Sequence, residues 1–221
     1  MKLLTNALTK FVCGLLLVGV LIFLPAGTLH YCKGWLFIGL LFVPMLIAGF
    51  VMFFKSPDFL AKRLDAKEKQ ATQKGVVAFS GLMFIAGFVV AGLDFRFAWS
   101  AMPAWVVTAA SVLFLVAYAL YAEVMRENAY LSRTIKVEEG QRVVDTGLYS
   151  IVRHPMYAVT ILLFIMIPLI LGSWYALIAF AFYPAIILVR LKNEEALLTK
   201  ELPGYEAYKQ KVKYRIIPFV W

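Results

Sequence analysis

The chain has 221 residues, of which 62% are hydrophobic and 16% are charged, and its formal net charge is +9. A soluble globular domain is nearer half apolar, so this composition excludes an ordinary soluble domain and indicates an integral membrane protein. The positive charge alone would suit a nucleic-acid-binding protein. The cations, however, flank apolar runs, where they commonly contact lipid headgroups, so we expect membrane lipids and no nucleic acid as partners.

In chain order, six apolar segments are expected to form membrane helices: residues 8–29, 34–54, 75–93, 104–123, 155–171 and 174–190. A bilayer core about 30 Å thick requires about 20 apolar residues per helix, and some of these segments barely reach that length. The first segment follows Lys2 and Lys10 and resembles a signal peptide, but the sequence LPAG after it is a poor cleavage site. We therefore expect a retained helix there, and an all-α, polytopic membrane bundle of about six transmembrane helices that ends in a helical hairpin.

The lysines and arginines are distributed unevenly between the two sides of this bundle. Twenty of the 22 fall in the first ten residues, in the polar stretches 55–74 and 124–154, or from residue 190 onward. Only Lys33 and Arg96 belong to the connections on the other side. Because cytoplasmic loops carry an excess of cations, both termini and all the long polar segments are predicted to face the cytoplasm.

The two cysteines, Cys13 and Cys32, do not form a C-x-x-C motif, and each lies in or beside an apolar segment. They predict neither a disulfide framework nor a thiolate metal site, and we expect no metal. Pro168 and Pro184 lie within the last two apolar segments. They are compatible with a kink that shapes a cavity and equally with an irregularity that the bundle tolerates.

The last hairpin turns at Gly172 and places polar residues at both of its open ends. His154 lies 18 residues before this glycine and Arg190 lies 18 residues after it. At about 1.5 Å per residue each arm is about 27 Å long, so both side chains should return to the same depth. Pro155 suits the first position of a helix, whose free N–H groups favour an anionic group. We expect one polar cluster there, formed by Tyr149, Arg153, His154, Tyr157, Arg190 and Glu194.

Judged from these residues alone, a second interpretation stays open. Arginine and histidine at the mouth of a helix are often anchors that snorkel to the membrane surface. Tyrosines at this depth can belong to an interfacial aromatic belt.

Three stretches carry a resemblance to a known family. The segment TGLYSIVRHPMYA, the segment RLKNEEALL after the hairpin, and the segment YEAYKQKVKYRIIP together resemble the isoprenylcysteine carboxyl methyltransferase family. They are more distantly similar to membrane phospholipid N-methyltransferases. The resemblance covers residues 134–218 approximately, and its specificity comes from the combination of R-H-P-x-Y with R-x-x-x-E-E at this spacing. It divides the chain into transmembrane scaffold helices (1–133) and a catalytic, cofactor-binding region (134–221).

The resemblance implies S-adenosylmethionine as cofactor, held without a Rossmann fold, and the chain has no G-x-G-x-x-G after a strand. It also implies the roles of particular residues. The residues implied in cofactor binding are Gln141, Arg142, Val143, Val144, Tyr149, His154, Pro155, Met156, Tyr157 and Glu194, with a weaker match at Thr134. Arg190 is placed at the reacting group of the substrate, and Arg190 and Glu194 are the implied catalytic pair. The chain departs from the family at Leu148, where proline is common, and at Ala158, where glycine is common.

The expected function is therefore an integral membrane methyltransferase that transfers a methyl group from S-adenosylmethionine to a lipophilic acceptor. A carboxylate is the expected acceptor, as in isoprenylcysteine carboxyl O-methylation, with the cofactor site on the cytoplasmic side and a prenylated or other lipophilic substrate arriving from the bilayer. Two alternatives within the class are N-methylation or S-methylation of a phospholipid or small molecule. Two outside it are a membrane reductase of the sterol-reductase type and a non-catalytic membrane scaffold.

Overall fold

The computed structural model describes residues 2–65, 71–131, 135 and 137–220, so Thr134 lies outside the described residues. The elements in this part of the chain are helical. They are α1 (Lys2–Ala26), α2 (Cys32–Lys55), α3 (Pro57–Leu64), α4 (Ala71–Phe97), α5 (Ala104–Glu127), the 3₁₀ helix η1 (Gly147–Ser150), α6 (Pro155–Leu171), α7 (Trp174–Phe180), α8 (Tyr183–Glu201) and α9 (Tyr205–Lys211).

The structure confirms the predicted all-α membrane bundle. In the described part of the chain, five helical stretches are long and apolar enough to cross a membrane: Lys2–Ala26, Cys32–Lys55, Gln73–Phe97, Ala104–Glu127 and Trp174–Glu201. The sixth expected helix, α6, is apolar but has only 17 residues. Its length of about 25 Å is at the lower limit for a spanning helix.

The expected helix at 174–190 is interrupted. α7 ends at Phe180, and α8 begins at Tyr183 with Pro184 in its first turn. Pro184 has no N–H to donate to the carbonyl of Phe180, and its ring crowds the preceding turn, which explains the break. Pro168, in contrast, lies inside α6 without ending it.

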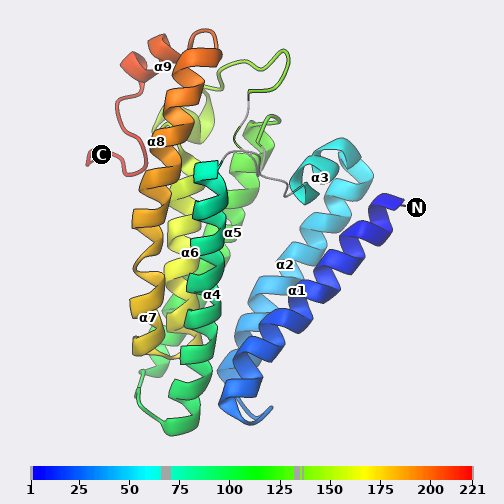
Figure 1. Ribbon diagram of the computed structural model, residues 1–221, viewed down its shortest axis with the longest axis vertical. Coiled ribbons are helices and arrows are strands. Elements are labelled where there is room, and N and C mark those ends of the chain that lie inside the picture. Colours follow the sequence, from blue (N-terminus) through cyan, green and yellow to red (C-terminus); the bar gives the residue numbers. More distant parts are fainter. Residues whose placement is uncertain (1, 66–70, 132–134, 136, 221) are drawn as a thin grey trace.

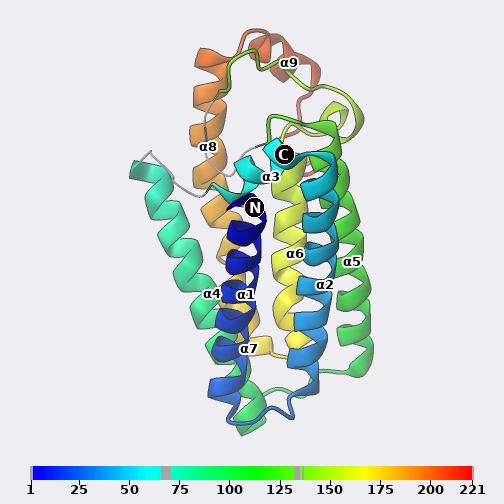
Figure 2. The ribbon, with the colours of Figure 1, turned by 90° about the vertical axis from the view of Figure 1, so that its right-hand side faces the viewer.

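The long helices run roughly along one common axis, with the α1–α2 pair inclined to the others (Figure 1). α6 occupies the interior, packing along α5 and also contacting α2, α4, α7 and α8, while α1 packs along α4. The short connections after α1, α4 and α6 lie at one end of the bundle. Both termini, α3, α9 and the segment that follows α5 lie toward the other end (Figures 1 and 2).

Aromatic side chains and glycines join the helices at the centre. Phe37 on α2 lies 5.7 Å from Phe88 on α4, between ring centroids, and Phe88 lies 6.1 Å from Phe180 on α7. Glycine permits the closest approach, because a Cβ at Gly92 would lie 2.5 Å from the carbonyl oxygen of Ile22 on α1. Such small residues let membrane helices pack with their backbones close together.

The turn between α6 and α7 fixes the hairpin from its closed end. Gly172 ends α6 with φ of 78°, and the Ser173 hydroxyl accepts a hydrogen bond from the Ala176 N–H at 3.0 Å. The buried Asp94 carboxylate of α4 accepts hydrogen bonds from Ser173 and, at 2.6 Å, from the hydroxyl of Ser100. This satisfied carboxylate ties α4 to the hairpin turn and so fixes the depth of both arms.

Candidate active site

The two open ends of the hairpin meet at the depth that their equal lengths predict. Arg190 Nε on α8 donates to Tyr157 Oη on α6 at 3.1 Å, and the Tyr157 hydroxyl donates to the Glu194 carboxylate. Arg190 and Glu194 reach the same phenol because they lie one turn apart on one face of α8. Tyr157 is only 3% exposed, so this cation, phenol and carboxylate form a contact that is largely shielded from solvent.

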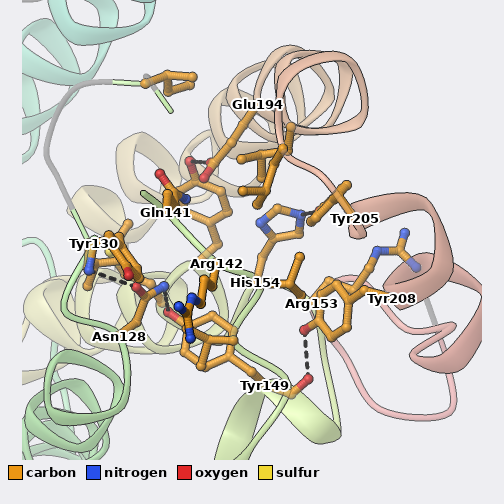
Figure 3. A pocket seen from close by; sticks show the side chains of 18 of the residues that line it. Asn128, Tyr130, Gln141, Arg142, Tyr149, Arg153, His154, Glu194, Tyr205 and Tyr208 are labelled. Atoms are coloured by element: carbon orange, nitrogen blue, oxygen red, sulfur yellow. Dashed lines mark hydrogen bonds between the residues drawn. The ribbon is translucent and has the colours of Figure 1, made fainter. Parts of the chain in front are cut away.

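One pocket at this end of the bundle gathers the predicted residues (Figure 3). Its lining includes Gln141, Arg142, Val143, Val144, Tyr149, His154, Met156, Tyr157, Arg190 and Glu194. Pro155, the first residue of α6, does not line the pocket, whereas Met156 and Tyr157, which follow it in the same turn, do. The space between the lining side chains is about 840 Å³, counting its opening to solvent.

Glu195 supports the pocket from behind. Its Oε1 accepts a hydrogen bond from Arg153 Nε at 2.7 Å and lies 3.2 Å from His154 Nε2, and its Oε2 accepts from Arg215 Nε at 2.9 Å. The His154 ring in turn stacks on Tyr157, with ring centroids 5.6 Å apart and planes at 21°. Glu195 is the last residue of the R-x-x-x-E-E motif, but the motif alone did not predict a role for it. The structure makes it the residue that orients the R-H-P segment.

The C-terminal segment also holds the R-H-P segment in place. The backbone N–H of Arg153 donates to the Tyr214 carbonyl at 2.9 Å, and that of His154 donates to the Arg215 carbonyl at 2.8 Å. The Arg153 guanidinium donates further to the carbonyl of Val212 at 2.8 Å. Residues after α9 are therefore part of the framework of the site, although they follow its last lining residue.

Tyrosines form the other wall of the pocket. Asn128 Nδ2 donates to Tyr149 Oη at 3.1 Å, and Tyr208 Oη donates to the Tyr149 carbonyl at 2.7 Å. Burial raises the pKa of Tyr149 to about 12, so its phenol stays protonated at neutral pH and keeps a hydrogen to donate. Tyr205 Oη lies 3.4 Å from His154 Nε2.

Sequence reasoning missed several lining residues: Asn128, Tyr130, Leu131, Ile135, Leu198, Leu202, Tyr205 and Tyr208. The tyrosines of α9 belong to the segment YEAYKQKVKYRIIP, which is one of the three stretches that resemble the family. Their place in that segment could have indicated that they line the pocket. Asn128, Tyr130 and Leu131 belong to the part of the chain expected to be scaffold.

A tight turn before η1 completes the pocket. The Gln141 side-chain oxygen accepts from the Glu138 N–H at 2.9 Å, and the Gln141 N–H donates to the Glu138 carbonyl at 3.0 Å. Lys62 on α3 forms an ion pair with the Glu138 carboxylate. Tyr130 Oη donates to the Gly140 carbonyl at 3.2 Å. The stretch that supplies Gln141 and Arg142 is thus held both by its own turn and by α3.

The side chains around the pocket fit S-adenosylmethionine chemically. Glu194 offers a carboxylate to a cationic or hydroxyl-bearing group, and the tyrosine rings offer flat apolar faces that also attract cations. The protonated Tyr149 phenol and the Arg142 guanidinium offer donors to polar or anionic groups. A ligand that is at once aromatic, cationic and carboxylate-bearing matches this mixture of residues.

Fold and site together define a class: a helical membrane protein with a polar, tyrosine-rich pocket at the end of the bundle opposite its short turns. Comparison with known proteins then adds a family match over part of the chain. Residues 107–200 match the family model described as "Isoprenylcysteine carboxyl methyltransferase (ICMT) family", which confirms the resemblance predicted from the sequence and supports a membrane methyltransferase.

A relative also matches part of the chain. Over 95 residues, the chain is 32% identical to "Uncharacterized protein YpbQ" of Bacillus subtilis (strain 168). This region is 42% of the chain, and it spans only 56% of the length of that relative. The relative's name assigns no activity.

Proposed function

We propose that the chain is an integral membrane methyltransferase that transfers the methyl group of S-adenosylmethionine to a lipophilic acceptor, with a carboxylate as its preferred acceptor group. The observation that carries the proposal is the contact of Arg190, Tyr157 and Glu194 inside one pocket. The family resemblance gives these residues duties toward the cofactor and the acceptor, and their meeting supports a single site for both.

Methyl transfer requires mainly that the acceptor atom, the methyl group and the sulfur lie in line. When bound, S-adenosylmethionine supplies an electrophilic methyl group on a positively charged sulfur. Transfer to a carboxylate forms a C–O bond as the C–S bond breaks, so the two opposite charges disappear and no proton moves. A site that holds acceptor and donor in line and excludes water therefore contributes most of the acceleration, which can reach several kcal/mol.

One group of residues binds the cofactor, and Arg190 orients the acceptor. Glu194, His154, Met156, Tyr157 and the turn at 141–144 bind the cofactor, with Tyr149 as an aromatic contact. Arg190 orients the acceptor near the methyl group. Its guanidinium is a planar fork that suits the two oxygens of a carboxylate, which favours this acceptor over an amine.

The site is proposed to face the cytoplasm. The uneven distribution of cations supports this orientation, and both termini lie toward the end of the bundle that carries the pocket (Figure 2).

The division into scaffold helices (1–133) and a catalytic region (134–221) remains part of the proposal. Asn128 and its neighbours nevertheless contribute directly to the pocket wall.

Calorimetric titration of the detergent-purified protein tests the cofactor assignment. The protein should bind S-adenosylmethionine and not a reduced nicotinamide nucleotide. Glu194→Gln should weaken binding at least tenfold, or about 1.4 kcal/mol, while Glu201→Gln at the exposed end of α8 should bind like wild type. Binding of the nicotinamide nucleotide alone would support the reductase alternative. Binding of neither ligand by folded protein would support the scaffold alternative.

A further inference from the structure

The C-terminal segment, residues 212–220, has one buried side and one exposed apolar side. Val212 and Ile216 are buried against the protein. Ile217, Phe219 and Val220 are 52%, 85% and 74% exposed, and Phe219 is the most exposed large apolar side chain in the described part of the chain. The segment follows the last of the described helices that could span a membrane, so it is not itself part of a span. Such a group of exposed apolar side chains marks an interaction surface.

Exposed aromatic side chains and the length of α6 give the depth at which this segment lies. At the end of the bundle that holds the short turns, Trp99, Trp174 and Tyr175 are exposed, as tryptophan and tyrosine often are at a membrane–water interface. α6 ends close to them in sequence, at Leu171, and its 17 residues rise about 25 Å, whereas the hydrocarbon core is about 30 Å thick. Pro155, the first residue of α6, therefore lies no farther out than the opposite edge of the core.

The C-terminal segment is bonded to the chain at this depth. The backbone N–H groups of Arg153 and His154, which directly precede α6, donate to the carbonyls of Tyr214 and Arg215 at 2.9 and 2.8 Å. Figure 1 shows the chain turning back from α9 and descending beside α8 to the C-terminus. The exposed side chains at 217–220 follow directly, so they lie at the edge of the core and not far out in the water.

The charges beside these side chains favour lipid as the partner. Lys213 is exposed, and the Lys211 side chain is 64% exposed although it forms an ion pair with Asp145. Lysine is depleted in interfaces between proteins. At a bilayer surface, in contrast, lysines contact anionic headgroups while neighbouring apolar side chains enter the boundary of the acyl chains.

We propose that the C-terminal segment is an interfacial anchor that binds the lipid surface of the bilayer. Ile217, Phe219 and Val220 contact acyl chains at the edge of the core, and Lys213 lies at the level of the headgroups. Because the same segment holds Arg153 and His154 through its carbonyls, the lipid surface helps to keep the R-H-P segment in place. The anchor goes beyond the proposed function and does not depend on which reaction the site carries out.

Fluorescence quenching in lipid nanodiscs tests the contact with lipid. The full chain, with Cys13 and Cys32 replaced by serine, carries an environment-sensitive fluorophore at Val220→Cys, and Glu206→Cys at an exposed position of α9 serves as the control. A nitroxide on the lipid chain near the headgroup should quench the label at 220 at least about threefold more than the label at 206. Iodide in the water should quench the two labels in the reverse order.

A further variant separates the anchor from the fluorophore. Phe219→Ser in the Val220→Cys protein should weaken quenching by the lipid nitroxide, because the phenylalanine and not the label holds the segment at the bilayer. Equal quenching by iodide at positions 220 and 206 would show that the segment lies in water and would overturn the proposal. A label at 220 that neither quencher reaches would mean that a protein, such as a second copy of the chain, covers the segment, and would overturn it as well.

Hydrogen exchange tests the support of the site. In nanodiscs, Phe219→Ser combined with Val220→Ser should speed exchange of the Arg153 and His154 amides at least about threefold, because the segment that bonds them loses its hold on the bilayer. Phe97→Ser, which removes an exposed phenylalanine at the other end of the bundle, should leave these amides unchanged. Unchanged exchange in the double variant would contradict the support of the site by lipid. Neither measurement uses S-adenosylmethionine, so a failure of the proposed function would leave both results interpretable.

Discussion

Replacing Glu195 by glutamine should distinguish a residue that supports the pocket from one that lines it. The substitution keeps the size of the side chain and one oxygen that accepts hydrogen bonds, but removes the charge shared by Arg153, His154 and Arg215. The side chains of Arg153 and Glu195 are 7% and 12% exposed, so little solvent replaces the lost interaction. We expect both a less stable protein and a displaced His154.

The magnitude follows from the burial of each pair. Breaking a buried ion pair by removing one partner costs about 3–5 kcal/mol when the remaining charge is left uncompensated. The Arg153 guanidinium keeps its bond to the Val212 carbonyl, and the Arg215 side chain is 37% exposed, so its pair is screened by solvent. The expected loss of stability is therefore about 2 kcal/mol. For a chain of this size that lowers the melting temperature by about 4–8 °C.

The assay combines thermal unfolding in detergent with S-adenosylmethionine titration, and Glu194→Gln is the matched comparison. Glu194 lines the pocket one residue earlier on the same helix, so its substitution should reduce affinity and leave the melting temperature within about 2 °C of wild type. Glu195→Gln should reduce both. A Glu195→Gln protein with wild-type melting temperature and wild-type affinity would refute the supporting role inferred from the hydrogen bonds.

Three other variants or labels test separate parts of the structure. Arg190→Lys keeps the charge but loses the planar fork, so turnover should fall at least about tenfold, or about 1.4 kcal/mol, with near-normal cofactor affinity; full activity would instead indicate a snorkelling anchor. In a thermal unfolding assay, Gly92→Ala should destabilise the bundle by about 1–3 kcal/mol through contact with α1, whereas Gly81→Ala, which meets open space, should be neutral or stabilising; equal effects would contradict the close packing. Single cysteines at Glu139 and Glu206, in a background without the native cysteines, should both react with a label only from the cytoplasmic side, and labelling of the first from outside would overturn the topology.

The hairpin and its residues were predictable because few physical rules decide them. The apolar length of α6, the proline at its start and the glycine at its end set its bounds at Pro155–Leu171, as expected. Equal arm lengths then brought Arg190 to the depth of Tyr157. These features can be recognised in the sequence without knowledge of the tertiary structure.

The remaining features depend on packing that the sequence does not display. Glu194 and Glu195 are neighbours of the same type, and only the position of α8 decides that one lines the pocket and the other supports it. Gln73 lies near the start of a helix without a motif, and its contact with Arg190 follows from how α4 packs on the hairpin. Pro184 explains the break before α8, but Pro168 lies inside α6 without ending it, so the prolines alone did not show which helix would be interrupted.

Transfer of a labelled methyl group tests the central claim most directly. Purified protein is incubated with S-adenosylmethionine labelled at the methyl carbon and with long-chain amphiphiles of equal chain length that carry a carboxylate, an amine or a thiol. We expect label to appear as the methyl ester of the carboxylate, and we expect Glu194→Gln to reduce the rate of labelling at subsaturating cofactor. Folded wild-type protein that binds S-adenosylmethionine but labels only the amine or the thiol would contradict the assignment of Arg190 to a carboxylate. Protein that transfers no label to any of the three heads or to an extract of membrane lipids would contradict the claim that the chain is a methyltransferase.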